Sequence, residues 1–186
     1  LTRLVVGPRQ TVRASGYDLS TYFTQLKEHE SGLQRNTVGR VFRGVGLEEY
    51  GALPHREYIL TLRCIGMGDV NAVDIAEVTH LEILSQQGAL MEAGLLEWGQ
   101  EFPTSSVLQG VYIDDGVVIG VIDAADLQRD GPDAELARKC LAALQAVEAE
   151  VNMKKGFGVL KPGAEEEGNF GDEDFVAWGT QVRGQK

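Results

Sequence analysis

The chain has 186 residues, of which 43% are hydrophobic and 24% charged, and its formal net charge is −11 at pH 7. This is the composition of an ordinary globular protein, and the length suits one domain with an adequate core. No apolar stretch is long enough to cross a bilayer and no signal-peptide pattern is present, so we expect no membrane partner.

The net charge bears on nucleic-acid binding, and the cysteines bear on the cellular compartment. A net charge of −11 argues against nucleic-acid binding, but residues 165–174 alone hold six acids and no base. Such a run is typically a solvated loop, so the total says little about the rest of the surface. The two cysteines lie in apolar patterns, which argues against a disulfide framework and favours a reducing, intracellular compartment, cytoplasmic or nuclear.

The hydrophobic patterning predicts the order β-α-β-β-α-β-β-α-β-β, with helices packed against an antiparallel sheet in an α+β architecture. The expected elements are a strand turning helical near Asp18 over residues 11–26, strands over 36–44 and 56–64, a helix over about 70–87, a hairpin over 107–122, a helix over 132–150, and strands over 151–160 and 175–182.

Each of the two long helices is expected to bury one face. Pro at an early position and acids in the first turn predict where the second helix begins. The stripe that contains Cys140 predicts that this thiol is a buried small hydrophobe. The expected inward residues are Ala72, Val73, Ala76, Ile83 and Leu84 in the first helix, and Leu136, Cys140, Leu144 and Val147 in the second.

The hairpin VYIDDGVVIG at 111–120 places Asp114 and Asp115 between two apolar runs. Turn carboxylates are common, but two adjacent ones can also bind a hard divalent cation through oxygen ligands. A two-metal site needs a further acid from another strand. Asp18, where a strand hands over to a helix, is the best candidate for that acid, although it could equally be a helix N-cap.

Five short motifs follow one another over nearly the whole chain. They are YDLSTYF at 17–23, GMGDVNAVDIAEV at 66–78, YIDD at 112–115, VNMKKG at 151–156 and FVAWGTQV at 175–182. Together they resemble the palm motifs of reverse transcriptases of the retrotransposon and retroviral type. A Tyr-x-Asp-Asp box alone is a weak signal, whereas the ordered set is specific.

The resemblance implies a polymerase palm with part of the fingers over residues 1–186, with a ferredoxin-like antiparallel sheet and helices on one face. The implied activity is RNA-directed DNA synthesis, in which a primer 3′-hydroxyl attacks a dNTP with the help of two Mg²⁺ ions, or Mn²⁺ in their place. The implied partners are an RNA or DNA template–primer, dNTPs, and the fingers, thumb and RNase H regions of the same polyprotein. Because the chain starts with Leu1, we expect a fragment with little activity of its own.

The resemblance also implies roles for single residues. Asp18, Asp114 and Asp115 would be the metal ligands. Lys155, rather than Lys154, would complete the catalytic set by protonating the leaving pyrophosphate.

The remaining matched positions concern the nucleotide and the primer. Phe23 would be the steric gate against a ribose 2′-hydroxyl, although it could be a plain core aromatic. The other implied contacts are Met67, Gly68 and Tyr112 at the nucleotide, and Trp178 and Gly179 at the primer grip.

Departures from the family pattern leave alternatives open. Retroviral enzymes often carry Gln where this chain has Met67, and the 96 residues from Asp18 to Asp114 exceed the retroviral spacing, which indicates insertions near 44–56 and 88–104. The alternatives are an RNA-dependent RNA polymerase palm, an inactive palm-like scaffold, or an acidic protein with a chance turn. In the last case Asp18 and the turn would have no reason to meet.

Overall fold

The protein combines helices with antiparallel sheets, which confirms the predicted α+β class. The structure, a computed structural model, describes residues 4–164 and 166–183. These residues divide into two units, one within residues 4–22, 74–164 and 166–183 and the other from residues 23–73. The order of helices and strands is the predicted one, although the last two strands are placed differently.

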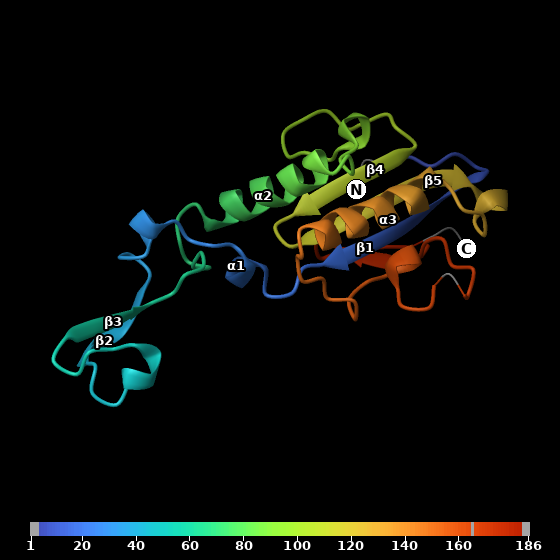
Figure 1. Ribbon diagram of the computed structural model, residues 1–186. Coiled ribbons are helices and arrows are strands. Elements are labelled where there is room, and N and C mark those ends of the chain that lie inside the picture. Colours follow the sequence, from blue (N-terminus) through green and yellow to red (C-terminus); the bar gives the residue numbers. More distant parts are fainter. Residues whose placement is uncertain (1–3, 165, 184–186) are drawn as a thin grey trace. The chain divides into compact units, whose positions relative to one another are not determined.

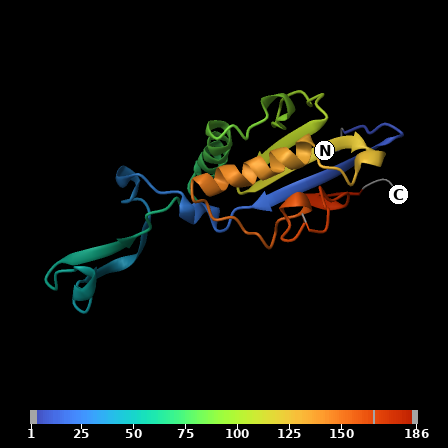
Figure 2. The ribbon, with the colours of Figure 1, turned by 45° about the vertical axis from the view of Figure 1, so that its right-hand side comes forward.

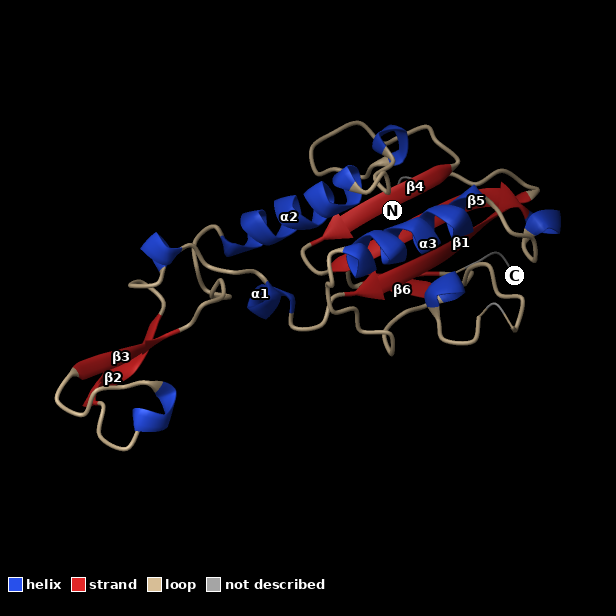
Figure 3. Cartoon of the chain, viewed as in Figure 1, coloured by secondary structure: helices blue, strands red, loops and turns tan. Residues whose placement is uncertain are grey.

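The first unit is built on a three-stranded antiparallel sheet in the order β1 (Gln10–Asp18), β5 (Asp115–Asp123) and β4 (Val107–Tyr112). Figure 1 and Figure 3 show the three strands side by side. The predicted hairpin is present, but its turn is shorter than Asp-Asp-Gly because Asp115 already belongs to β5. Ile113 takes a left-handed φ of 57°, which allows two residues to close the hairpin.

One face of this sheet carries a hydrophobic core shared with a second, small hairpin. That hairpin pairs β6 (Phe175–Ala177) with β7 (Thr180–Val182), so the single strand expected over 175–182 is wrong. Its turn, Trp178-Gly179, has positive φ at both residues, as a type I′ hairpin turn requires. The buried core residues are Val12, Ala14, Leu108, Val117, Ile119, Phe175 and Ala177.

Both long helices contact the opposite face. Arg13 and Tyr17 lie four residues apart on β1 and therefore point to one side of the sheet. Tyr17 bonds α2 (Ala72–Gln86), and Arg13 bonds α3 (Pro132–Ala146). Figure 1 and Figure 2 show α3 running along the sheet in both views.

The buried rows of these helices correct two expectations. Val73 and Val147 were expected to face inward, but they are 41% and 44% exposed. In α2 the buried row recurs every fourth residue and includes a histidine, whereas Val147 lies just beyond the end of α3. The fully buried members are Ala72, Ala76, His80 and Leu84 in α2 and Ala134, Ala137, Cys140 and Leu144 in α3.

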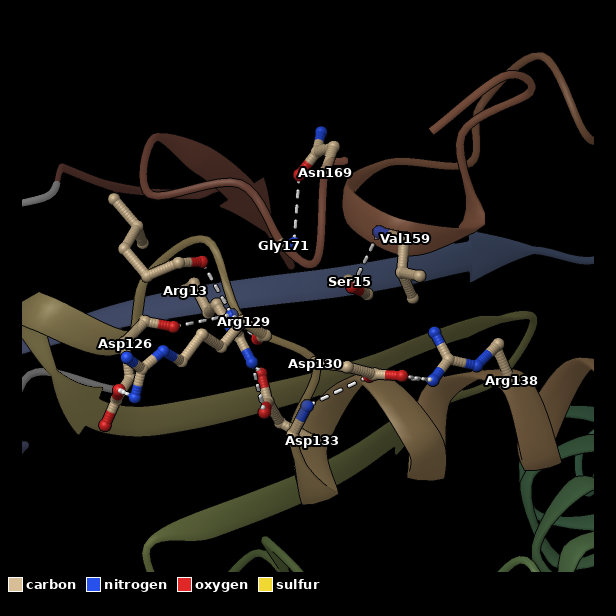
Figure 4. Close-up of polar contacts among 12 residues, drawn as sticks. Arg13, Ser15, Asp126, Arg129, Asp130, Asp133, Arg138, Val159, Asn169 and Gly171 are labelled. Atoms are coloured by element: carbon tan, nitrogen blue, oxygen red, sulfur yellow. Dashed lines mark hydrogen bonds and ion pairs between the residues drawn. The ribbon is translucent and has the colours of Figure 1, made fainter. Parts of the chain in front are cut away.

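A buried ion pair joins β1 to the start of α3. The Arg13 guanidinium donates from Nε and Nη2 to the two carboxylate oxygens of Asp133, at 2.7 and 2.9 Å. It also donates to the carbonyls of Leu127 and Arg129, each at 2.7 Å. Figure 4 shows Arg129 and Asp133 around the Arg13 side chain. Gly120 leaves room for the pair, since a Cβ there would lie 2.7 Å from Asp133 Cγ.

The free edge of β1, opposite β5, is covered by irregular chain. Isolated bridges join Leu19 to Val151, Gly16 to Phe157 and Ala14 to Asp172. The strand expected over 151–160 is therefore wrong. Gly158 has a φ of +62° and begins a 3₁₀ turn (Gly158–Leu160), so this segment cannot stay extended alongside β1.

The second unit contains one antiparallel hairpin of β2 (Thr37–Arg43) and β3 (Glu57–Thr61). Phe42 and Tyr58 stack across it, with ring centroids 6.4 Å apart. The short helix α1 (Tyr22–Gln25) begins at the last residue of the first unit. Among the described helices, none has the length and apolar character that crossing a membrane requires.

Candidate metal and nucleotide site

Asp18 and Asp115 face each other on neighbouring strands. Asp18 is the last residue of β1, and the β1–β5 register pairs it directly with Asp115, the first residue of β5. Paired residues point to the same face of a sheet, so the two carboxyl groups meet. Asp18 is only 8% exposed. It is not an N-cap, because α1 begins four residues later at Tyr22.

The pKa of Asp115 reflects the burial and the charge of its surroundings. Burial, with the charges of Asp114 and Asp18 as further causes, raises the pKa of Asp115 to about 6. The negative charges of Asp114 and Asp18 thus disfavour a further negative charge on Asp115.

Asp114 occupies the turn beside this pair. Its backbone carbonyl accepts a hydrogen bond from Leu19 N at 2.9 Å, which ties the turn to the end of β1. The negative charge of its carboxylate helps to raise the pKa values of Asp115 and Tyr22. The structure therefore places all three acids of the predicted set at one end of the sheet.

Lys155 supplies the cation of the site in this structure. Its Nζ donates to Asp18 Oδ1 at 2.6 Å, and this hydrogen bond raises the pKa of the ammonium. The segment that carries it is held against β1, because Asn152 N donates to the carbonyl of Asp18 at 2.8 Å. Lys154 is exposed. Of the two lysines, Lys155 is the one that the fold brings to the carboxylates.

The donor set suits a hard divalent cation. Carboxylate oxygens are the ligands that Mg²⁺ prefers. The pKa of Asp115 is raised by burial and by the charges of Asp114 and Asp18, which marks a place where added positive charge is favourable. The arrangement is that of a carboxyl pair with an ammonium. Within residues 4–164 and 166–183, no group of three or more His, Cys, Asp or Glu side chains is placed so that it could hold a metal ion.

A groove of about 980 Å³ adjoins the carboxylates. Asp115, Tyr112 and Trp178 line it on the sheet side, and the loop over residues 96–103 lines much of the rest. Tyr112, on the same sheet face as Asp115 by register, is 53% exposed. The indole of Trp178 packs on Gly110 of β4, where a Cβ would collide with the ring. The glycine thus fixes where the Trp178-Gly179 turn meets the sheet.

Three predicted residues belong to the second unit. Phe23 is half-buried in α1, and Met67 and Gly68 lie in a turn before α2. Met67 is 80% exposed, and a Cβ on Gly68 would meet no described atom within 4 Å. The carboxylates, Tyr112 and Trp178 all belong to the first unit.

Sequence reasoning missed a buried polar residue next to the site. His80 is fully buried on α2, and its Nε2 lies 2.9 Å from the hydroxyl of Tyr17 on β1. Its Nδ1 lies 2.9 Å from the carbonyl of Ile113, the residue before Asp114. The signal was present in the sequence, because His80 falls four residues from both Ala76 and Leu84 in the apolar row of the helix.

Comparison with known proteins adds no relative. A scan against protein-family models finds no match, and a search of curated proteins finds none either. What can be inferred about the site therefore comes from its own residues and their geometry.

Proposed function

We propose that the chain is the palm, with part of the fingers, of a retroelement reverse transcriptase that synthesises DNA on a template. The observation that carries the proposal is the pairing of Asp18 with Asp115 across β1 and β5, with Asp114 in the adjoining turn. These are the residues that the motif resemblance singled out, and they come from segments almost 100 residues apart. A ferredoxin-like palm accounts for such a sheet with both long helices on one face.

In this proposal the role of the carboxylates is to bind metal cations. Asp18, Asp114 and Asp115 would hold two Mg²⁺ ions, which supply activation of the attacking oxygen and neutralisation of the leaving group. Lys155 already lies within hydrogen-bond distance of Asp18, so its ammonium could deliver a proton to the leaving pyrophosphate. The protein's own contribution is positioning and electrostatics rather than covalent chemistry.

The other residues of the proposal act on the substrates. Tyr112, exposed beside Asp115, would pack near the primer terminus, and the Trp178-Gly179 turn across the groove would hold the primer strand. Phe23 would exclude a ribose 2′-hydroxyl by filling its space, and Met67 and Gly68 would lie against the nucleotide. RNA or DNA template–primer and dNTPs are thus the proposed partners.

A second candidate function is a palm-like scaffold that has lost catalysis. Two observations favour it: the described residues present no preformed group of three metal-binding side chains, and an ammonium pairs with Asp18. A scaffold would keep the fold but would bind dNTP no better with Mg²⁺ than without it.

Calorimetric titration of a dNTP into the 186-residue chain, with and without Mg²⁺, separates the two. Binding is a better readout than primer extension here, because it tests the metal and nucleotide site without requiring a bound nucleic-acid duplex. We expect Mg²⁺-dependent binding of dNTP that Asp18→Asn and Asp114→Asn each abolish. Asp74→Asn, an exposed acid at the start of α2, is the matched control and should bind as the wild type does. Binding that ignores Mg²⁺ or both active-site substitutions would refute the polymerase proposal.

A further inference from the structure

A buried histidine lies between two tyrosines underneath the aspartate turn. The ring of His80 is 5.6 Å from that of Tyr17 and 5.9 Å from that of Tyr22, centroid to centroid. All three side chains are buried. The Tyr22 hydroxyl donates to the carbonyl of Ala76 at 3.2 Å, so this tyrosine packs against His80 without bonding to it.

The hydrogen bonds of His80 have a defined direction. A carbonyl can only accept, so Nδ1 must carry the proton that bonds Ile113 O. In the neutral ring that carries its proton on Nδ1, Nε2 is an acceptor, so the Tyr17 hydroxyl donates to it. Burial, which lowers the pKa of His80, favours this neutral form. Tyr17 therefore fixes the tautomer that can hold the turn.

The Ile113–Asp114 turn has a strained backbone that its surroundings must stabilise. Ile113 is a β-branched residue with a φ of 57°, a conformation that costs energy unless the surroundings enforce it. The next residue is Asp114, whose carbonyl accepts from Leu19 N. The bond from His80 thus acts one residue before a proposed metal ligand, at the most strained point of the hairpin.

We propose that His80 is a positioning residue, which holds the Ile113–Asp114 turn through its Nδ1–H and so sets the place of the Asp114 carboxylate. Tyr17 is the second member of this device, because it selects the tautomer. The consequence for metal binding rests on the proposed function, whereas the ordering of the turn does not.

Four variants separate this role from simple packing. His80→Asn keeps an amide donor near the position of Nδ1, whereas His80→Gln places its amide near Nε2 instead. Tyr17→Phe removes only the hydroxyl that selects the tautomer. Tyr22→Phe is the matched control, since it removes a buried hydroxyl from the same cluster that does not bond His80.

The first readout is amide hydrogen exchange at Leu19, whose N–H bonds the turn, relative to Ala14, whose N–H bonds Asp172 at a distance from it. Loss of one buried hydrogen bond raises local exchange about tenfold. We expect that rise at Leu19 alone in His80→Gln, a smaller one in Tyr17→Phe, and wild-type ratios in His80→Asn and Tyr22→Phe. Equal acceleration at Leu19 and Ala14 would mean a merely structural role and overturn the inference.

The second readout is Mn²⁺ affinity of the chain, followed by electron paramagnetic resonance. His80→Gln should weaken binding at Asp114 about tenfold, by the same lost bond, while His80→Asn retains it. Unchanged affinity in His80→Gln overturns the functional part of the inference. If the wild-type chain binds no Mn²⁺ through Asp114, the polymerase proposal fails, and the exchange ratio still decides whether His80 holds the turn.

Discussion

Removing one member of the buried Arg13–Asp133 pair should destabilise the protein severely. The two side chains are only 1% and 4% exposed, so Asp133→Ala leaves a guanidinium without its counter-charge inside the protein. Loss of one partner from such a pair typically costs about 3–5 kcal/mol. Arg13 keeps its bonds to the carbonyls of Leu127 and Arg129, which places Asp133→Ala near the lower end, at about 3 kcal/mol.

Replacing the other member of the pair, Arg13→Met, should reduce the free energy of unfolding more. It leaves the Asp133 carboxylate buried and unpaired, and it also strips the donors from the carbonyls of the 124–130 loop, for a total of about 5 kcal/mol. The double variant should be more stable than the sum of both losses predicts, because it removes both charges together. A loss of this size is a large part of the about 5–15 kcal/mol that stabilises a typical domain.

Urea unfolding followed by far-ultraviolet circular dichroism measures these changes as midpoint shifts at constant slope. The matched control is Glu135→Gln in the same helix, because Glu135 pairs with Lys139 at the surface, where both side chains are more than half exposed. Its unfolding midpoint should stay that of the wild type. If Asp133→Ala shifted the midpoint no more than this control does, the Arg13–Asp133 ion pair would not stabilise the fold as a buried pair should.

Three further predictions concern the site. The pKa of Asp115 is about 6 in the fold against an ordinary 3.8, so its contribution to stability is fully present below pH 4 and is lost as the pH rises through 6. Asp115→Asn should remove this loss and be more stable than the wild type at pH 8 by about 1 kcal/mol after allowance for solvent screening. Equal pH–stability profiles of the two proteins would contradict this prediction. Lys155→Met should raise Mn²⁺ affinity severalfold in a spin-resonance titration, because the ammonium no longer competes for Asp18; weaker binding would show that it assists the metal instead. Gly110→Ala should cost about 1–3 kcal/mol in the urea assay, since a methyl there collides with Trp178, and a neutral result would place the indole elsewhere.

Local signals predicted much of the fold. Gly131-Pro132 marks the start of α3 within one residue, and the apolar runs on both sides of Asp114 predict β4 and β5. These features depend on neighbours in sequence, so patterning finds them. The segment 151–160 shows where patterning fails, because its path is set by bridges to β1, more than a hundred residues away.

The candidate site divides in the same way. The carboxylates are visible as a motif, and Asp18 was connected to them by its place at the end of a strand and by the resemblance. The β1–β5 register pairs Asp18 with Asp115. The buried polar residues of the first unit were not predicted. From sequence alone, Arg13 is expected at the surface and His80 interrupts an apolar row. Both can be buried only because tertiary partners satisfy their polar atoms, Asp133 for Arg13 and the carbonyl of Ile113 for His80.

The most direct measurement of the central claim is the number of Mn²⁺ ions that the chain binds in the presence of a dNTP. Two-metal nucleotidyl transfer requires ions about 3.5–4 Å apart, close enough to give a spin-coupled resonance signal. We expect two coupled Mn²⁺ ions per chain, with the coupled signal lost in Asp18→Asn and in Asp114→Asn and kept in Asp74→Asn. A single uncoupled ion, or coupling that survives both active-site substitutions, would contradict the assignment of these carboxylates to a polymerase site.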